Sequence, residues 1–74
     1  MTTATQRGRQ LPSLKAWREY RALTQRELAS KAGVGSATIA RLETGSATYA
    51  TTIRKLARAL KVKPEDLLDE PDRG

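Results

Sequence analysis

A link of three residues, Gly33-Val34-Gly35, separates two segments that both carry the sequence signals of α-helices. The first begins at Thr24-Gln25-Arg26-Glu27, which fits a capping box, in which a hydroxyl and a carboxylate satisfy N–H groups at a helix start. It should stop at Gly33, because glycine tolerates the left-handed conformation that follows many helices. The second should cover about residues 36–44. Two helices joined so closely must cross at a steep angle, which the small Ala29 and Ala32 permit.

The rest of the chain carries the same helical spacing of apolar residues. Four of them recur at the period of one helix face within residues 50–60: Ile53, Leu56, Ala57 and Leu60. A helix is also predicted over about residues 12–22, with Ser13 as its N-cap and Trp17 buried. A last short helix should begin at Pro64, where the missing N–H costs nothing. No stretch alternates apolar and polar residues as a half-buried strand does, so the sequence predicts an all-α fold of five short helices.

Several residue types that carry enzyme chemistry are missing from the sequence. Histidine and cysteine are both absent, which removes the commonest general base, the usual zinc ligands and a thiolate nucleophile. A chain of 74 residues is also too short to bury a substrate well. We therefore expect that the protein is not an enzyme and that it holds no metal, no cofactor and no small-molecule ligand.

The charges are divided unevenly along the chain, whose formal net charge is +6. Residues 1–63 carry thirteen Lys and Arg residues against three Glu, whereas residues 64–74 are acidic. A strongly basic body indicates a polyanionic partner, with nucleic acid as the leading candidate. A solvated surface rich in Lys and Arg is the alternative that charge alone leaves open.

The two ends of the chain differ in composition from its middle. We expect residues 1–10 to form a disordered N-terminal arm, residues 11–68 a single domain, and residues 69–74 an acidic flexible tail. Apolar residues never run to more than two in succession, so no segment is expected to span a membrane. Because the N-terminus also lacks the pattern of a secretory signal, the sequence predicts a cytoplasmic protein.

The stretch TQRELASKAGVGSATIARLETG, residues 24–45, resembles the helix-turn-helix of the phage repressor and Cro family, also called the xenobiotic-response-element type. The matching positions are Gln25, Ala29, Gly33, Ile39 and Leu42. The resemblance extends to SLKAWREYRALTQ before it and TTIRKLARALKVKPEDLL after it, and covers about residues 13–68. It implies a lambda-repressor-like DNA-binding domain that places its third helix in the major groove of double-stranded DNA.

The resemblance also implies which residues read DNA bases. Ser36, Ala37 and Arg41 match the family's base-reading positions in the third helix. Arg41 can place two donors on guanine N7 and O6, and Ala37 can contact a thymine methyl. The alternative for Arg41 is a surface residue bonded to a local carboxylate. Gly35 stands where the family usually has Ser or Thr, so Ser36 is also a candidate N-cap, a role that would take its hydroxyl away from the bases.

A larger set of residues is implied to contact DNA phosphates. Gln25 is expected at a helix N-terminus, where unpaired N–H groups and the helix dipole favour an anion. The matching Gln in the family braces the DNA backbone and a side chain of the recognition helix, and the alternative is a solvated Gln that merely suits a helix start. The other implied phosphate contacts are polar residues in and after the third helix: Thr38, Thr44, Ser46, Thr48, Tyr49 and Thr51. For Tyr49 the alternative is packing on the fourth helix.

Two further sets of residues are implied to support the site. In the family, residues at the positions of Arg18 and Glu43 commonly form an ion pair that braces the first and third helices. Family members also bind as two-fold dimers, with half-sites about one helical turn apart. The surface left for such a contact is the end of the fourth helix and the start of the fifth, so a homodimer interface is expected at Leu60, Val62 and Pro64.

The leading function is a sequence-specific DNA-binding transcriptional regulator, either a repressor or an activator. Its size suits Cro-like regulators, antitoxin-like partners and the controller proteins of restriction–modification systems, and the sequence does not choose among them. The alternative is a protein-interaction adaptor of the same fold, which a large exposed apolar patch would favour. RNA binding ranks third, because the three aromatic residues are too few for stacking platforms.

Overall fold

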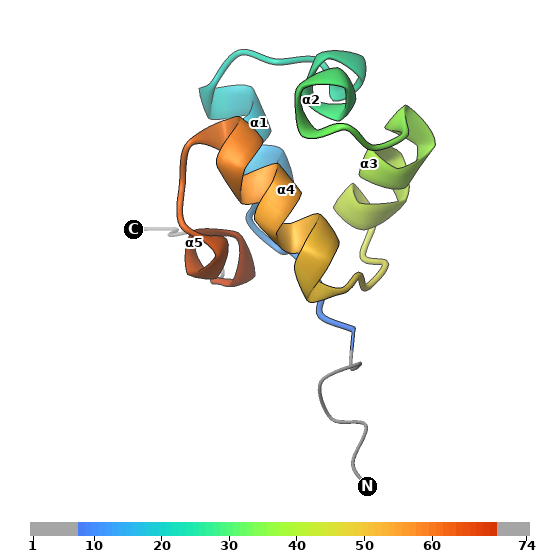
Figure 1. Cartoon of the computed structure of the whole chain (residues 1–74), viewed down its shortest axis with the longest axis vertical. Helices are drawn as coiled ribbons and strands as arrows, with labels where there is room; N and C mark the ends of the chain where they lie inside the picture. Colours follow the sequence, from blue (N-terminus) through green and yellow to red (C-terminus); the bar gives the residue numbers. More distant parts are fainter. Residues whose placement is uncertain (1–7, 70–74) are drawn as a thin grey trace, which may run out of the picture.

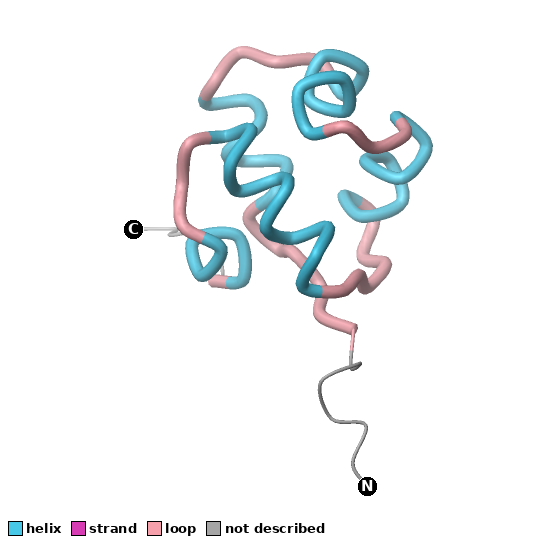
Figure 2. The backbone as a smooth tube through the Cα atoms, in the orientation of Figure 1, coloured by secondary structure: helices cyan, strands magenta, loops and turns pink. Residues whose placement is uncertain are grey.

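The computed structural model describes residues 8–69 and folds them into five helices that pack without a sheet (Figures 1 and 2). In chain order the helices are α1 (Leu14–Tyr20), α2 (Gln25–Ala32), α3 (Ser36–Glu43), α4 (Ala50–Leu60) and α5 (Pro64–Leu68). The predicted all-α fold of five short helices is confirmed. None of the described helices is long and apolar enough to cross a membrane.

The helix boundaries follow local sequence signals at most positions. α4 has the bounds that its apolar spacing predicts, and α5 begins at Pro64, where the missing N–H removes no helical hydrogen bond. α1 is shorter than predicted, since it ends at Tyr20. The reason lies in Ala22, which takes a left-handed conformation with a φ of 58° and cannot continue the helix.

Ser13 precedes α1 but does not cap it, which corrects the predicted role of this residue. Its side chain makes no hydrogen bond to the helix start. The hydroxyl donates instead to the carbonyl of Asp69, and the N–H donates to the carbonyl of Leu67 at 3.3 Å. Because Ser13 is buried, these bonds satisfy groups that would otherwise be costly to leave unpaired. The residue therefore joins the start of α1 to the end of α5.

The core is one apolar cluster to which all the described helices contribute. α4 lies across the middle of the domain in Figure 1 and packs against both α2 and α5. The buried side chains are Leu11, Leu14, Leu28, Ala29, Ala32, Ile39, Leu42, Ile53, Leu56, Ala57, Leu60 and Leu67. Trp17, which was predicted to be buried, is only half-buried against this cluster. Leu11 lies outside every helix yet is 3% exposed, a core residue that helical spacing could not reveal.

A short extended segment ahead of α1 lies along the loop between α3 and α4. Arg9 and Thr48 form an antiparallel bridge, in which the N–H of Arg9 donates at 2.7 Å and the N–H of Thr48 donates back at 2.9 Å. The side-chain amide of Gln10 donates to the carbonyl of Gly45 at 2.8 Å. Residues 8–10 of the expected N-terminal arm are therefore held against the domain, while 1–7 and 70–74 lie outside the described residues. The division into arm, domain and tail remains a prediction.

Candidate nucleic-acid interface

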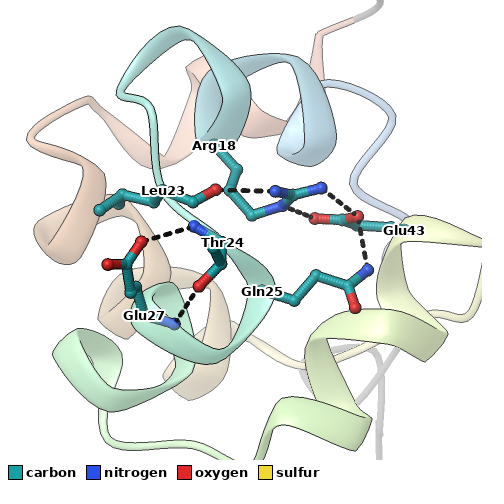
Figure 3. A network of polar contacts seen from close by, with 6 residues as sticks. All are labelled: Arg18, Leu23, Thr24, Gln25, Glu27 and Glu43. Atoms are coloured by element: carbon teal, nitrogen blue, oxygen red, sulfur yellow. Dashed lines mark hydrogen bonds and ion pairs between the residues drawn. The ribbon is translucent and has the colours of Figure 1, made fainter.

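The start of α2 is fixed by a complete capping box (Figure 3). The Thr24 hydroxyl accepts a hydrogen bond from the N–H of Glu27 at 3.0 Å, and the Glu27 carboxylate accepts from the N–H of Thr24 at 2.8 Å. The box predicted from the sequence is confirmed. It leaves the N–H groups of Gln25 and Arg26 without a partner inside the helix, at the end where the helix dipole favours an anion.

The turn between α2 and α3 is built on a left-handed glycine. Gly33 has a φ of 75° and a ψ of 33°, the conformation that the sequence predicted. The N–H groups of Gly33 and Val34 donate to the carbonyl of Ala29 at 2.8 and 3.0 Å, which closes α2. The chain then enters α3 at Ser36, so the two helices follow one another almost without a loop.

α3 has one face in the core and one face on the surface. Ile39 and Leu42 are buried, whereas Ser36, Ala37 and Arg41 are all exposed. Ala37 and Arg41 are four residues apart and therefore lie on the same side of the helix, while Ser36 is exposed at its start. In the described part of the chain the only ion pair joins Arg18 to Glu43, so no local carboxylate holds the guanidinium of Arg41.

Ser36 is the first residue of α3 rather than its N-cap. Gly35 occupies the N-cap position and has no side chain with which to cap. Among the described residues the Ser36 hydroxyl makes no hydrogen bond. Ser36 therefore does not act as the N-cap, and its hydroxyl stays available at the surface. The N–H of Thr38 donates to the carbonyl of Gly35 at 3.0 Å, which leaves the N–H groups of Ser36 and Ala37, with this hydroxyl, at the exposed start of α3.

Arg18, Glu43 and Gln25 form a polar network that joins α1, α2 and α3 (Figure 3). Nε and Nη2 of Arg18 donate to the two carboxylate oxygens of Glu43 at 2.5 and 3.1 Å, and Nη1 donates to the carbonyl of Leu23 at 2.7 Å. The Gln25 amide donates to Glu43 Oε1 at 3.0 Å. The side chains of Arg18 and Glu43 are only 12% and 5% exposed, so water competes little for these bonds.

The network shifts the pKa of both charged partners. Hydrogen bonding to Glu43 raises the pKa of Arg18 above its ordinary value, against the opposing effect of burial. Burial alone would raise the pKa of Glu43, but the hydrogen bonds from Arg18 and Gln25, with the charges of Arg18 and Lys15, outweigh it and lower that pKa. Both partners are therefore ionised at neutral pH, as a buried ion pair requires.

The loop between α3 and α4 is less open to phosphate than its polar sequence suggests. The hydroxyl of Thr44 donates to the carbonyl of Arg41 at 2.8 Å, and Thr44 would have to give up this bond to donate elsewhere. The N–H groups of Thr44, Gly45 and Ser46 bond to carbonyls at the end of α3, and the N–H of Thr48 bonds to Arg9. Hydroxyl groups, rather than backbone N–H groups, are what this loop offers to an anion.

The remaining residues expected at phosphates differ in exposure. Ser46, Tyr49 and Thr51 are exposed, whereas Thr38 and Thr48 are half-buried. Tyr49 is 55% exposed, so more than half of its surface is open to a ligand. No side chain caps the start of α4, and the first N–H groups of that helix are therefore unpaired beside Tyr49 and Thr51.

The residues expected at a dimer interface are not equally available. Leu60 is 0% exposed and fully enclosed in the core, so it cannot contact a second copy, and its assignment is corrected. Its carbonyl accepts a hydrogen bond from Nε of Arg21 at 2.9 Å, which ties the end of α1 to the end of α4. Val62 is half-buried and Pro64 is exposed, and these two residues alone can still serve such a contact.

Sequence reasoning missed the contacts that join distant parts of the chain. The bridge from Arg9 to Thr48 and the bond from Gln25 to Glu43 carry no local sequence signal, because both depend on how the helices pack. The one sign for Gln25 is the family resemblance, in which the matching Gln braces a side chain of the recognition helix.

Comparison with known proteins agrees with this geometry. The sequence pattern of the helix-turn-helix family matches residues 14–67. The HTH-type transcriptional repressor RghR of Bacillus subtilis (strain 168) is 46% identical over 57 residues, which cover 74% of this chain and 42% of that protein. This chain thus spans less than half of the length of that repressor.

Solved structures of similar fold are also known. The restriction–modification controller protein C.AhdI from Aeromonas hydrophila superposes with a TM-score of 0.71 at 31% identity, over 73% of this chain and 83% of that chain. PhpD, solved with cadmium, superposes with a TM-score of 0.69 at 29% identity, over 88% of this chain but only 14% of its own. The match over most of the five helices, with the turn at Gly33 and the two-faced α3 at its centre, means that the chain belongs to the phage repressor and Cro-type helix-turn-helix family of DNA-binding regulators.

Proposed function

We propose that the protein is a cytoplasmic, sequence-specific transcriptional regulator that places α3 in the major groove of an operator. The observation that carries this proposal is the outward face of α3, where Ser36, Ala37 and Arg41 are exposed together. A B-DNA major groove is about 12 Å wide and accepts one α-helix. Because no described carboxylate pairs with Arg41, its five N–H donors are free for a guanine edge.

The flanking elements offer groups for the phosphates on either side of α3. Gln25 stands at the uncommitted N–H groups of the start of α2, and its amide nitrogen keeps a second N–H beside the one that it donates to Glu43. On the other side, Ser46, Tyr49 and Thr51 are exposed around the uncapped start of α4. Two helix N-termini beside a reading helix suit the double row of phosphates that borders a groove.

The adaptor alternative finds less support in the structure. Among the described residues the exposed large apolar side chains are Tyr20 and Tyr49. Tyr49 precedes the first turn of α4, whereas Arg21, next to Tyr20, bonds to the last turn of the same helix. The two rings therefore lie at opposite ends of α4 and do not form the contiguous apolar patch that a protein-docking surface favours.

The proposal is tested by selecting bound fragments from a random duplex library at a stated salt concentration. Enrichment of one sequence is the expected result. Binding that depends on salt but selects no sequence would instead identify a general nucleic-acid binder. A variant with Arg41 changed to Ala serves as the matched control, because it should bind DNA and yet select a less defined sequence.

We also propose that two copies bind one operator as a two-fold dimer. A single small module contacts only about 600–1,000 Å² of surface, which is little for finding one site in a genome. The exposed Pro64 and half-buried Val62 at the junction of α4 and α5 are the apolar residues on offer. Sedimentation with a selected duplex measures how many protein chains bind one DNA molecule, and a comparison of Pro64→Glu with the wild type tests this contact. A one-to-one wild-type complex on a non-palindromic site would contradict the dimer.

A further inference from the structure

The loop proposed to meet DNA lacks the charge that phosphate binding normally uses. Residues 44–52, from the end of α3 into the first turn of α4, contain no Lys or Arg. Cationic side chains supply most of the affinity of a protein for a DNA backbone. Positive charge from another part of the chain would therefore add to what the hydroxyls and N–H groups of the loop offer to phosphates.

The structure brings such charge to the loop through the segment ahead of α1. Arg9 pairs with Thr48 through both of its backbone groups, at 2.7 and 2.9 Å, and Gln10 is anchored on the carbonyl of Gly45 at 2.8 Å. Gly8 makes the approach possible, because a Cβ at that position would lie 3.0 Å from the Cβ of Ala47. Arg9 is thus fixed beside the loop, and its side chain is exposed.

A second cation approaches the same loop from α1. Lys15 is exposed and lines a hollow of about 260 Å³ whose other walls include Gln10, Thr44 and Gly45. Glu43 also borders this hollow, but its carboxylate is held by Arg18 and Gln25. Within residues 8–69 no carboxylate forms an ion pair with Arg9 or Lys15, and the interaction of Lys15 with Glu43 is through charge alone, without a direct contact.

We propose that Arg9 and Lys15 form a phosphate clamp around the α3–α4 loop and supply the two backbone-binding cations that the loop itself lacks. The clamp rests on the proposed DNA-binding function and extends it to residues outside the helix-turn-helix. It binds a duplex phosphate by charge and carries no sequence information. The bridge to Thr48 positions Arg9, so the position of the segment matters as well as its charge.

The chain offers matched controls on another surface. Arg58 and Lys61 line a separate hollow of about 490 Å³ with residues from the end of α2. They carry the same charges as Arg9 and Lys15 and are likewise exposed, but no contact links them to the α3–α4 loop. Loss of one of these charges changes the net charge equally without changing the clamp.

The experiment measures the affinity for a selected duplex and for scrambled DNA across a range of salt concentrations. Arg9→Gln and Lys15→Gln should each reduce the slope of log affinity against log salt by about 0.9, which is about eightfold in affinity at 0.1 M salt. The loss should be equal on both duplexes, so that discrimination stays unchanged. Arg58→Gln and Lys61→Gln should leave the slope unaltered.

Positioning is tested separately from charge by Gly8→Val. The added side chain meets Ala47 and displaces the segment while Arg9 keeps its charge, so the slope should fall as it does for Arg9→Gln. Thermal unfolding of each variant, followed by circular dichroism, checks that the domain stays folded. A wild-type slope in Arg9→Gln and Lys15→Gln overturns the clamp, as does an equal fall in the two control variants.

Failure of the clamp and failure of the proposed function give different results. If the wild type selects a sequence, and Arg41→Ala weakens that selection while Arg9→Gln keeps the wild-type slope, then only the clamp is wrong. If the wild type neither selects a sequence nor binds DNA in a salt-dependent way, the proposed function is wrong, and the clamp with it.

Discussion

Nε of Arg18 lies 2.5 Å from Oε2 of Glu43, and this contact ties the middle of α1 to the last residue of α3. Gln25, the first residue of α2, donates to the same carboxylate at 3.0 Å. One buried side chain thus fixes three helices relative to one another. The orientation of the proposed recognition helix therefore depends on a charge that lies almost entirely out of water.

Removal of either partner should destabilise the domain before it affects recognition. Arg18→Ala or Glu43→Ala leaves a buried charge uncompensated, which costs about 3–5 kcal/mol, close to all the stability of a domain this small. Both variants should be largely unfolded at ambient temperature in thermal melts. The control is Glu19→Ala, because Glu19 is an exposed residue of α1. Its free energy of unfolding should stay within about 0.5 kcal/mol of that of the wild type. A melt of either pair variant within a few degrees of the wild type would contradict a buried brace.

Stability should fall in acid because of Glu43. The pKa of this carboxyl is lower in the folded protein than its ordinary value of 4.5, so the unfolded state takes up the proton first. The stabilisation is complete above the ordinary pKa and is lost as the pH falls through the lowered one. Urea unfolding followed from neutral pH into acid measures this loss.

The hydrogen bond from Gln25 offers a check on that assignment. Gln25→Ala removes one of the bonds that lower the pKa of Glu43, so its acid transition should move to higher pH. Gln10→Ala removes an amide that bonds to a backbone carbonyl instead, and its transition should stay at the wild-type pH. If the acid transition moved by the same amount in both variants, Glu43 would not be the group that controls the loss of stability in acid.

Gly33→Ala should destabilise the turn through the backbone alone. A Cβ at Gly33 meets nothing within 4 Å, but the residue has a φ of 75°, which costs a side chain about 1–2 kcal/mol. The melting temperature should fall by about 4–8 °C for each kcal/mol lost. Gly35→Ala is the control, because Gly35 has a φ of −78° and its Cβ would make an ordinary contact with Thr38. The turn argument fails if the two variants melt alike.

Arg41→Ala should lose discrimination more than general affinity. A bidentate base contact is worth about 1–3 kcal/mol against the wrong base, while the phosphate contacts stay in place. The ratio of affinities for a selected site and for scrambled DNA measures this loss. Arg41→Lys should behave similarly, because an ammonium keeps the charge but not the planar pair of donors. Equal losses on both duplexes would make Arg41 a phosphate contact.

Elements set by neighbouring residues could be predicted from the sequence. The capping box at Thr24 and Glu27, the left-handed Gly33 and the bounds of α4 all depend on interactions within a few residues. The same holds for the outward face of α3, since helical periodicity alone separates Arg41 from Ile39. The all-α fold followed from these local signals together.

Contacts across the chain could not be predicted in this way. Ser13 has the residue type of an N-cap, yet burial beside α5 gives its hydroxyl a different partner. Leu60 was expected at an interface because it ends a helix, but packing encloses it in the core. The cations beside the α3–α4 loop come from residues 9 and 15, far from the loop in sequence. In each case tertiary packing, rather than propensity, decides the role.

The bond between Ser13 and Asp69 also bears on the order in which the domain assembles. Its partners are separated by 56 residues, so it closes almost the whole described chain into one loop, whose entropic cost must be met before the bond forms. The α2–α3 unit depends on contacts between near neighbours, which form fast. α5, with five residues, is too short to persist alone. We therefore expect α2 and α3 to assemble first and the contact between Ser13 and Asp69 to form last. Early unfolding excursions should open this contact first and leave α2 and α3 intact, which amide hydrogen exchange measures.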